Sequence, residues 1–296
     1  MQSYNNHILV PMDFSEQAMI ALDQSYNLAR LTKADITLLY VMDEDHKNLF
    51  SIFTKEKQRE TEEKKYEKGI KTRLESLAKE TITKAGVHVF TRIKTGKIYD
   101  EIIDVASELN AAFIIMGTNG QVSLKKRFIG SNALRVVKEA HCPVITIKGK
   151  KHRAGCKNIV LPLDLTQESK EKVVKAIELA NYFGSAIRLV TVVNTSDEGI
   201  VKKYTLQLKQ VESFIKKHGL VVTSEFASNS NVAEGVIKYA KKVKGDLIMI
   251  MTQSEMDWTD LFIGSTAQEI INDSDVPVLS IHPMERPEES VIPFNF

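Results

Sequence analysis

The chain contains an internal repeat, since segments of its first half recur in the same order in its second half. The segment ILVPMDFS at 8–15 matches IVLPLDLT at 159–166, and this offset of 151 residues persists without a gap through residue 192. Farther along, IYDEIIDVA at 98–106 matches VAEGVIKYA at 232–240 with an offset of 134. A repeat of this length indicates two units of the same fold.

Each repeat alternates short apolar runs with segments of helical periodicity. The runs show little alternation of polar and apolar residues, as expected for strands buried on both faces of a parallel sheet. Strand–helix–strand repetition implies right-handed crossovers. The sequence therefore predicts an α/β fold of two tandem doubly wound domains, each a five-stranded parallel sheet flanked by helices. In the first repeat the strands are expected near 8–12, 36–42, 88–93, 113–116 and 144–148.

The predicted domains span residues 1–149 and 156–296, joined by the polar, glycine-containing segment at 148–158. The two offsets differ by 17 residues, which places an insertion of that length in the first repeat, within 43–80. This segment is highly charged, and a long solvated helix is the prediction for it.

Composition narrows the functional classes. The chain has 296 residues and a formal net charge of +2. So small a net charge does not indicate binding to nucleic acid. It has no apolar run of about 18 residues and no signal-like amino end, so no membrane association is expected. Two cysteines, Cys142 and Cys156, suit a reducing cytosol, and the seven scattered histidines form no metal-ligand spacing. We therefore expect a cytoplasmic protein without a metal site.

Two strand ends of the first repeat carry residues suited to a ligand. In an open parallel sheet, ligands bind at the carboxyl ends of the strands. Asp13 follows the first strand and Gly117 follows the fourth. The Asp13 carboxylate could accept hydrogen bonds from a ribose or hold a metal near phosphates, or it could cap the next helix, although Ser15 would do so more naturally.

The stretch MGTNGQVSLKKRFIGSNAL at 116–134 has Gly117 and Gly120 three positions apart, then nine residues, then Gly130 and Ser131. Glycines let the backbone approach a ligand closely, and successive N–H groups before a helix amino terminus form an anion site. The alternative is that the glycines only turn the chain and that Ser131 only caps the following helix.

The second copy, MTQSEMDWTDLFIGSTAQE at 251–269, keeps the later Gly-Ser pair, and Ser265 with Gln268 forms a capping-box pattern. It has Met251 and Ser254 in place of the first two glycines. We infer that the fold does not require those two glycines, whereas a ligand in the first repeat could require them.

The nine residues inside this motif differ in charge between the copies. QVSLKKRFI carries +3 and EMDWTDLFI carries −3, so phosphate would be attracted to the first and repelled by the second. The charged residues are Lys125, Lys126 and Arg127 in the first copy, and Glu255, Asp257 and Asp260 in the second.

At these residues the chain resembles the universal stress protein family, whose pattern is Gly, two residues, Gly, nine residues and Gly-Ser or Gly-Thr. The segments ILVPMDFS, TGKIYDEIIDVASELNAAFIIMG and HCPVITI look like the family's first strand, third helix with fourth strand, and last strand. The resemblance covers both halves of the chain. It implies the strand order 3-2-1-4-5 and ATP binding in members that keep the glycine pattern.

Carried over residue by residue, the resemblance implies that the first domain binds ATP, with or without Mg²⁺. Asp13 would face the ribose, the backbone of Val41 would contact adenine, and the glycine motif would hold the phosphates. Ala133 departs from the pattern, since the family often has a hydroxyl there. The second domain keeps only Asp164, Gly264 and Ser265, so no ATP is expected in it. The residues assigned to the nucleotide are Pro11, Met12, Asp13, Val41, Met116, Gly117, Asn119, Gly120, Gly130, Ser131 and Asn132.

The family also dimerises through its last strand. The corresponding strands VITIK and VLSIH are apolar and edge-like, so the two domains are expected to pair as an internal pseudo-dimer, with the tail at 283–296 draped across a surface. We also expect a homodimer of tandem chains and a protein partner that the sequence does not identify.

Three functions remain open from the sequence. The chain could be a nucleotide-dependent stress regulator, or an interaction scaffold that binds no nucleotide and is built on the pseudo-dimer. An ATP-hydrolysing enzyme is the least favoured, because the chain has no Walker sequence and no adjacent nucleophile–base pair. At most, weak hydrolysis is expected.

Overall fold

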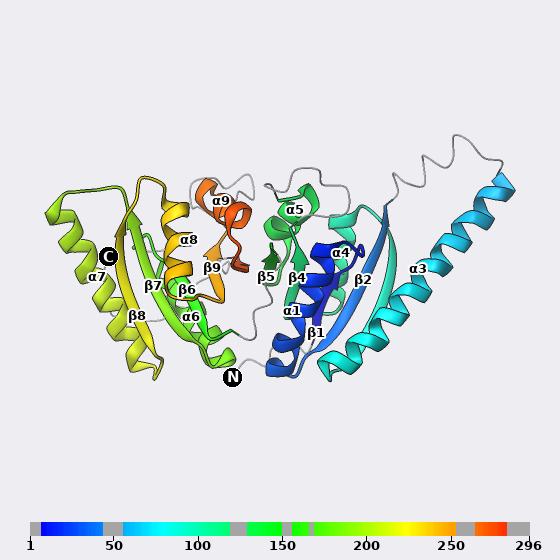
Figure 1. Ribbon diagram of the computed structural model, residues 1–296, viewed down its shortest axis with the longest axis horizontal. Helices are drawn as coiled ribbons and strands as arrows, with labels where there is room; N and C mark the ends of the chain where they lie inside the picture. Colours follow the sequence, from blue (N-terminus) through cyan, green and yellow to red (C-terminus); the bar gives the residue numbers. More distant parts are fainter. Residues whose placement is uncertain are drawn as a thin grey trace. The chain divides into compact units, whose positions relative to one another are not determined.

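The structure is a computed structural model that describes residues 7–43, 56–118, 129–149, 156–165, 169–252 and 264–282, with the backbone alone for residues 56–61. The described residues form two compact units, one ending at Val144 and the other beginning at Ile145, apart from Ile129, which groups with the second. Each repeat has its own set of strands and helices (Figure 1).

The first repeat has the strand order β3-β2-β1-β4-β5. Strand β1 pairs in parallel with β2 and with β4, and β2 pairs in parallel with β3. The strands are β1 (His7–Pro11), β2 (Asp35–Asp43), β3 (Val89–Gly96), β4 (Phe113–Gly117) and β5 (Val144–Ile147), and the helices are α1 (Glu16–Thr32), α3 (Glu56–Ala85), α4 (Ile98–Glu108) and α5 (Ser131–Glu139).

The second repeat has the same order, β8-β7-β6-β9-β10, with parallel pairs throughout. Its strands are β6 (Asn158–Pro162), β7 (Ala186–Val193), β8 (Val222–Ser228), β9 (Leu247–Met251) and β10 (Val278–Ile281), and its helices are α6 (Ser169–Phe183), α7 (Glu198–Lys217), α8 (Val232–Lys242) and α9 (Ser265–Asp273). The predicted α/β architecture and the strand order are confirmed.

The strands form because their apolar residues can be buried on both faces of the sheet. In β1, the side chains of Ile8, Leu9 and Val10 are all fully buried. Right-handed crossovers place α1 and α3 in contact with each other on one face, and α4 and α5 in contact on the other. The same arrangement brings the carboxyl ends of β1, β2 and β4 to one edge, where the candidate site lies.

The helix caps agree with the sequence in one case and correct it in two. Ser15 caps α1, since its hydroxyl accepts the Ala18 N–H at 3.2 Å. The predictions that Ser131 and Ser265 are N-caps are wrong by one residue. The caps of α5 and α9 are Gly130 and Gly264, neither of which provides a side-chain cap, and the serines are the first helical residues.

The inserted segment of the first repeat is helical in the part that the structure describes. Helix α3 has 30 residues, whereas its counterpart α7 has 20, which confirms a long helix in this region. In Figure 1 the carboxyl-terminal half of α3 lies beside β2 and β3, and its amino-terminal end diverges from them. Residues 44–55 lie outside the described part.

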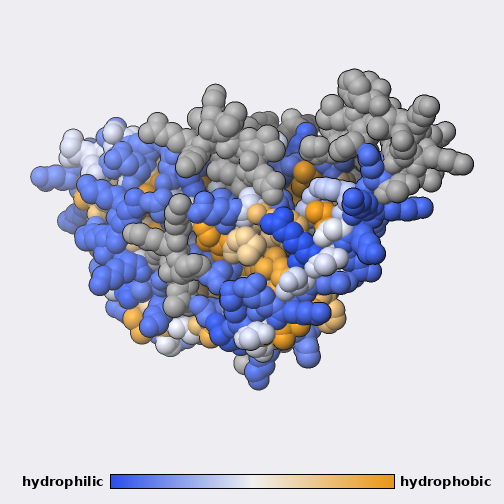
Figure 2. All heavy atoms as spheres, turned by 45° about the vertical axis from the view of Figure 1, so that its right-hand side comes forward, coloured by the Kyte–Doolittle hydropathy of each residue, from blue (hydrophilic) through white to orange (hydrophobic). Residues whose placement is uncertain are grey.

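The described residues on the side of the molecule shown in Figure 2 give the surface a mainly hydrophilic character. Figure 2 shows mostly hydrophilic residues with apolar ones scattered among them on the side that it presents. Scattered apolar residues are usual on a folded protein and mark no interface by themselves. Among the described helices, none is long and apolar enough to cross a bilayer. The large apolar side chains that are exposed include Leu31, Tyr66, Ile82, Phe90, Leu206 and Val221.

Candidate functional site

The predicted site residues that the structure describes meet at the carboxyl edge of the first repeat's sheet. Pro11 lies opposite Leu39 in β2. The register that pairs Ile8 with Phe113 brings Pro11 level with Met116 in β4. Met12 and Met116 have buried side chains, with 3% and 6% exposure, so each could meet a ligand only through its backbone.

Asp13 lies in the loop between β1 and α1 and is half-exposed. Its Oδ1 accepts the backbone N–H of Ser15 at 2.9 Å, which fixes the carboxylate beside the strand end. The next residue, Phe14, has a left-handed backbone with φ of 59°. Leu165 in the second repeat has φ of 60°, so this loop conformation belongs to the fold and not to a ligand.

Gly117 is explained by packing inside the first repeat. A Cβ atom at this position would lie 2.7 Å from the Cβ of Gln17 and 2.9 Å from its carbonyl carbon. The first turn of α1 therefore approaches β4 too closely for any side chain at residue 117. The sequence argument that the fold does not require this glycine is wrong for the first repeat, because the second repeat's Met251 says nothing about the position of α1.

The start of α5 is the part of the predicted phosphate site that lies within the described residues. The Gly130 N–H donates to the carbonyl oxygen of Thr118 at 2.7 Å, so this amide is already engaged. The carbonyl of Gly130 accepts the Leu134 N–H, which opens the helix. Ser131 is exposed and Asn132 is half-buried, and the amides of a helix's first turn have no intrahelical acceptor. Ala133 is buried, with 3% exposure.

The remaining predicted site residues are Val41, which the structure describes, and loop residues, which it does not. Val41 is half-buried in β2, opposite Lys94 of β3. Asn119 and Gly120 fall outside the described residues, as do the oppositely charged loop residues of both repeats. Their roles stay predictions.

The second repeat differs in a way that the sequence comparison missed. At the 151-residue offset, Ala18 and Ala21 of α1 become Ser169 and Lys172 of α6. The Ser169 hydroxyl donates to Asp164 Oδ1. The Lys172 ammonium donates to the carbonyl oxygen of Pro162 at 3.3 Å. Burial lowers the pKa of Lys172, and the nearby Asp164 charge opposes this effect.

Ser169 and Lys172 therefore donate hydrogen bonds to groups at the strand edge of the second repeat. The matching alanines of the first repeat have no side-chain donor for such bonds. Asp164, the counterpart of Asp13, already has a hydroxyl donor and a neighbouring cation from its own chain. The change from Ala21 to Lys172 was visible in the ungapped alignment of the repeats. The sequence did not show what this lysine contacts, because only the fold places this face of α6 beside the end of β6.

Replacing Lys172 with methionine should leave the second unit at least as stable as before. A cation that is lowered in pKa by burial costs free energy at neutral pH, and an apolar side chain of similar length avoids that cost. We expect the free energy of unfolding to stay equal or rise by about 1 kcal/mol, measured by urea denaturation. A loss of more than about 1 kcal/mol would show that the ammonium is a net stabilising partner of Asp164.

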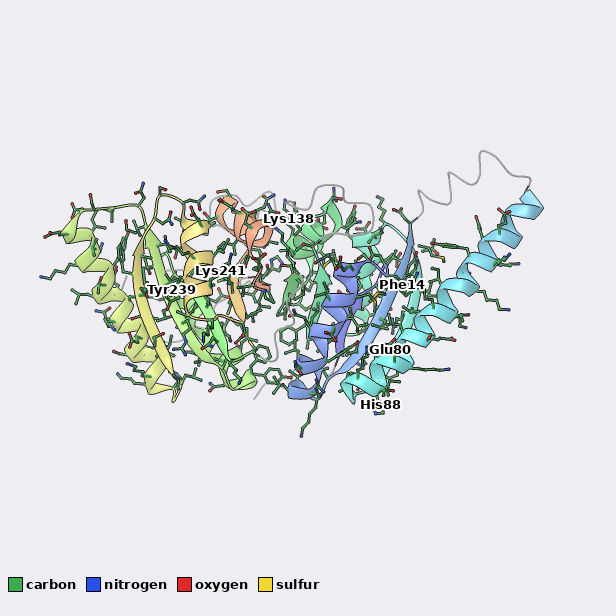
Figure 3. The ribbon with its side chains drawn as sticks, in the orientation of Figure 1. Phe14, Glu80, His88, Lys138, Tyr239 and Lys241 are labelled. Atoms are coloured by element: carbon green, nitrogen blue, oxygen red, sulfur yellow. The ribbon has the colours of Figure 1, made fainter. Side chains whose placement is uncertain are left out.

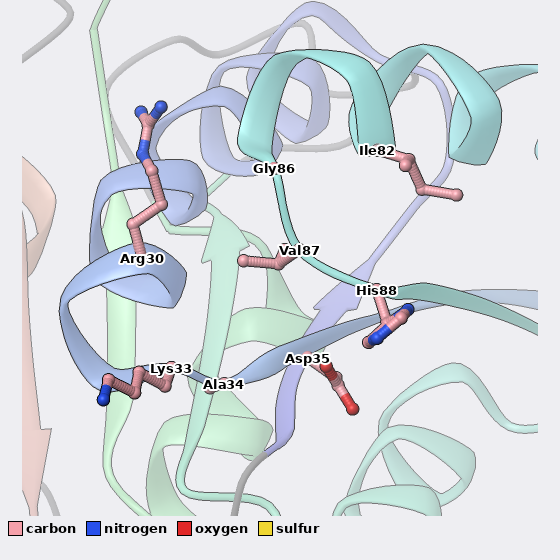
Figure 4. Close-up of a pocket in the computed structure, with 8 residues that line it drawn as sticks. All are labelled: Arg30, Lys33, Ala34, Asp35, Ile82, Gly86, Val87 and His88. Carbon is pink, nitrogen blue, oxygen red and sulfur yellow. The ribbon is translucent and has the colours of Figure 1, made fainter.

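A cavity of 560 Å³ lies at the other end of the first repeat's strands (Figure 4). Arg30 and Lys33 come from the carboxyl end of α1, where cations are favoured by the helix dipole. His88 and Asp35 lie at the amino ends of β3 and β2, far along the strands from Asp13. The cavity is thus on the edge opposite to the one where ligands of such sheets bind. Its lining residues are Arg30, Lys33, Ala34, Asp35, Ile82, Gly86, Val87 and His88.

Both cysteines lie within the described residues. Burial raises the pKa of the Cys142 and Cys156 thiols to about 12, so neither is a ready nucleophile. Within the described ranges, no three His, Cys, Asp or Glu residues group as metal ligands.

Comparison with known proteins identifies the family. The model of the universal stress protein family matches residues 5–148 and again residues 155–282. Universal stress protein MJ0577 of Methanocaldococcus jannaschii is 32% identical over 155 residues, which cover 48% of this chain and 94% of the relative. Universal stress protein MJ0531 of the same organism is 31% identical over 153 residues, covering 49% of this chain and 82% of the relative.

A solved structure supports the same fold over nearly the whole chain. The crystal structure of a universal stress protein from Archaeoglobus fulgidus covers 96% of this chain and 98% of its own, with a TM-score of 0.72 and 19% identity. The family model accounts for both repeats, which confirms the resemblance found at the glycine motif. The chain belongs to the universal stress protein family and contains two tandem copies of its domain.

Proposed function

We propose that the first domain binds ATP, with or without Mg²⁺, at the carboxyl edge of β1, β2 and β4, and that the protein acts as a nucleotide-dependent regulator in a cytoplasmic stress response. The observation that carries the proposal is the asymmetry between the two strand edges. In the second domain, Ser169 of α6 donates to Asp164 and Lys172 donates to the carbonyl oxygen of Pro162, whereas the matching positions of α1 are the buried alanines Ala18 and Ala21.

The residues present fit such a ligand. A carboxylate at the carboxyl edge of the sheet can accept hydrogen bonds from ribose hydroxyls, as acidic side chains do in other open parallel sheets. The first turn of α5 offers backbone amides and a positive helix dipole to phosphate. The N–H of Gly130 already donates to Thr118, so Gly130 can only let a phosphate group approach the backbone closely. Ala133 has no hydroxyl that could bind phosphate.

The alternative is an interaction scaffold that binds no nucleotide, built on the two domains and functioning through a protein partner or a homodimer of tandem chains. One observation favours it: Gly117, a leading argument for a ligand, is already explained by its contact with Gln17. The two functions differ in a direct binding measurement.

Calorimetry with Mg-ATP on the whole chain should show one site per chain. Asp13→Asn should weaken binding about tenfold, since the amide keeps an acceptor for the Ser15 N–H but loses the charge that favours ribose hydroxyls. Asp164→Asn is the matched control in the second domain and should leave ATP affinity unchanged. Absence of heat from the wild type would reject the regulator and support the scaffold, and equal effects of both variants would contradict the assignment to the first domain.

A further inference from the structure

Helix α3 contacts the loop and the strand that carry the predicted nucleoside contacts. The Cζ atom of Arg73 lies 3.9 Å from the centroid of the Phe14 ring. The hydroxyl of Tyr66 lies 3.0 Å from the hydroxyl of Tyr40. Arg73 and Tyr66 are both in α3, so this long helix reaches the edge of the candidate site.

The four side chains form one group, which we call the α3 cluster: Phe14, Tyr40, Tyr66 and Arg73. The rings of Phe14 and Tyr40 connect its two halves, with centroids 5.7 Å apart. Burial raises the pKa of Tyr40, and its hydrogen bond with Tyr66 raises it further. Phe14 is labelled in Figure 3, where it lies at the side of β2 that faces α3.

The α3 cluster adjoins both predicted nucleoside contacts. Phe14 directly follows Asp13, and Tyr40 directly precedes Val41. The fold gives Phe14 its left-handed backbone, as it does Leu165, so contacts with the Phe14 side chain act on a loop of defined conformation. A guanidinium is attracted to an aromatic face. The contact from Arg73 therefore restricts the movement of Phe14 and of the loop that carries it.

The second repeat lacks the two aromatic residues that α3 contacts in this cluster. Leu165 and Thr191 take the positions of Phe14 and Tyr40. Leucine has no aromatic face for a cation, and the Thr191 hydroxyl instead donates to the carbonyl oxygen of Leu163 at 2.9 Å. The α3 cluster thus occurs in the repeat that keeps the complete glycine motif.

We propose that Arg73 and Tyr66 are positioning residues for the nucleoside end of the ligand. By holding Phe14 and Tyr40 they fix the Asp13 carboxylate and the Val41 backbone at the spacing that ribose and adenine need. This inference rests on the proposed ATP site. It assigns to α3 a role in binding that the exposed, charged sequence of this helix does not suggest.

The test compares three variants of the full chain by calorimetry with ATP and with adenosine. Arg73→Gln should weaken both ligands about tenfold, because the α3 cluster adjoins only the nucleoside end. Arg73→Lys should recover most of the affinity, since it keeps a cation over Phe14. Lys71→Ala removes a charge from an exposed position of the same helix and should change affinity less than twofold.

Other outcomes would overturn the proposal. Wild-type affinity in Arg73→Gln would show that the loop does not depend on α3. A loss for ATP alone, shared by Lys71→Ala, would reduce the effect to the general attraction of phosphate by positive charge.

A second measurement separates this proposal from the ATP site itself. Without nucleotide, the Ser15 amide that donates to Asp13 should exchange with solvent several-fold faster in Arg73→Gln than in the wild type or in Lys71→Ala. If the wild type binds no ATP, the proposed function fails, yet faster exchange would still support the hold of α3 on the loop. Unchanged exchange would overturn that hold whatever the protein binds.

Discussion

Replacing Gly117 with alanine is expected to destabilise the first unit by about 1–3 kcal/mol, although only one methyl group is added. The new Cβ would lie 2.7 Å from the Cβ of Gln17 and 2.9 Å from its carbonyl carbon. The second of these atoms is backbone, so relief requires a shift of the first turn of α1 away from β4. Urea denaturation and hydrogen exchange of the α1 amides measure the effect.

Gly69→Ala is the matched control for Gly117→Ala. Gly69 lies on the exposed face of α3, and a Cβ there would meet nothing within 4 Å. Alanine in a helix interior is favoured over glycine by about 0.5–1 kcal/mol, so this variant should be more stable than the wild type. Equal stability of Gly117→Ala and the wild type would mean that α1 adjusts freely at this contact. A loss of ATP binding in Gly117→Ala would then point to the ligand, because packing would no longer explain it.

Replacing Glu212 with glutamine is expected to remove about 1–3 kcal/mol of stability from the second unit at pH 7. The Glu212 side chain in α7 is only 9% exposed, and its carboxylate lies 2.8 Å from Lys209 Nζ and 2.7 Å from Lys216 Nζ. The hydroxyl of Ser224 in β8 donates to the same carboxylate. Glutamine fits the space but leaves two ammonium groups without their counter-charge.

The loss should depend on pH in a defined direction. Burial by itself would raise the pKa of Glu212, but the hydrogen bonds from Lys209, Lys216 and Ser224 outweigh it and lower the pKa from 4.5 to about 2. A carboxylate with a lowered pKa in the folded state stabilises it above the ordinary value, and this contribution disappears as the pH falls from about 4.5 towards 2. The difference between wild type and Glu212→Gln should therefore be full at pH 7 and small near pH 2.

The control for Glu212→Gln is an exposed pair of the same kind. Glu80 and Lys84 in α3 are 2.7 Å apart, but both side chains are 55% exposed. Such pairs contribute little, so Glu80→Gln should cost less than about 0.5 kcal/mol. Urea unfolding from pH 7 to pH 2.5, with hydrogen exchange of α7 and β8, measures both variants. A pH-independent difference for Glu212→Gln would contradict the charge-based explanation.

The sequence alone determined the fold class, the repeat and the approximate strands of the first domain. This was possible because those properties depend on patterns close together in the chain, such as the apolar run from Ile8 to Val10 before a segment of helical period. The family followed from a motif in one loop, Gly117 to Ser131, read with its flanking blocks. The caps of α5 and α9 were missed by one residue, because a serine can either cap a helix or begin it.

The tertiary structure alone decided what several of those residues do. Gly117 meets Gln17, which is distant in the sequence, only because parallel crossovers bring α1 beside β4. Lys172 reaches Pro162, and Arg73 covers Phe14, for the same reason. A contact between distant residues depends on how the elements pack, and the order of residue types along one chain does not record that packing. The sequence could therefore identify the ligand edge, whereas the side chains that shape it required the fold.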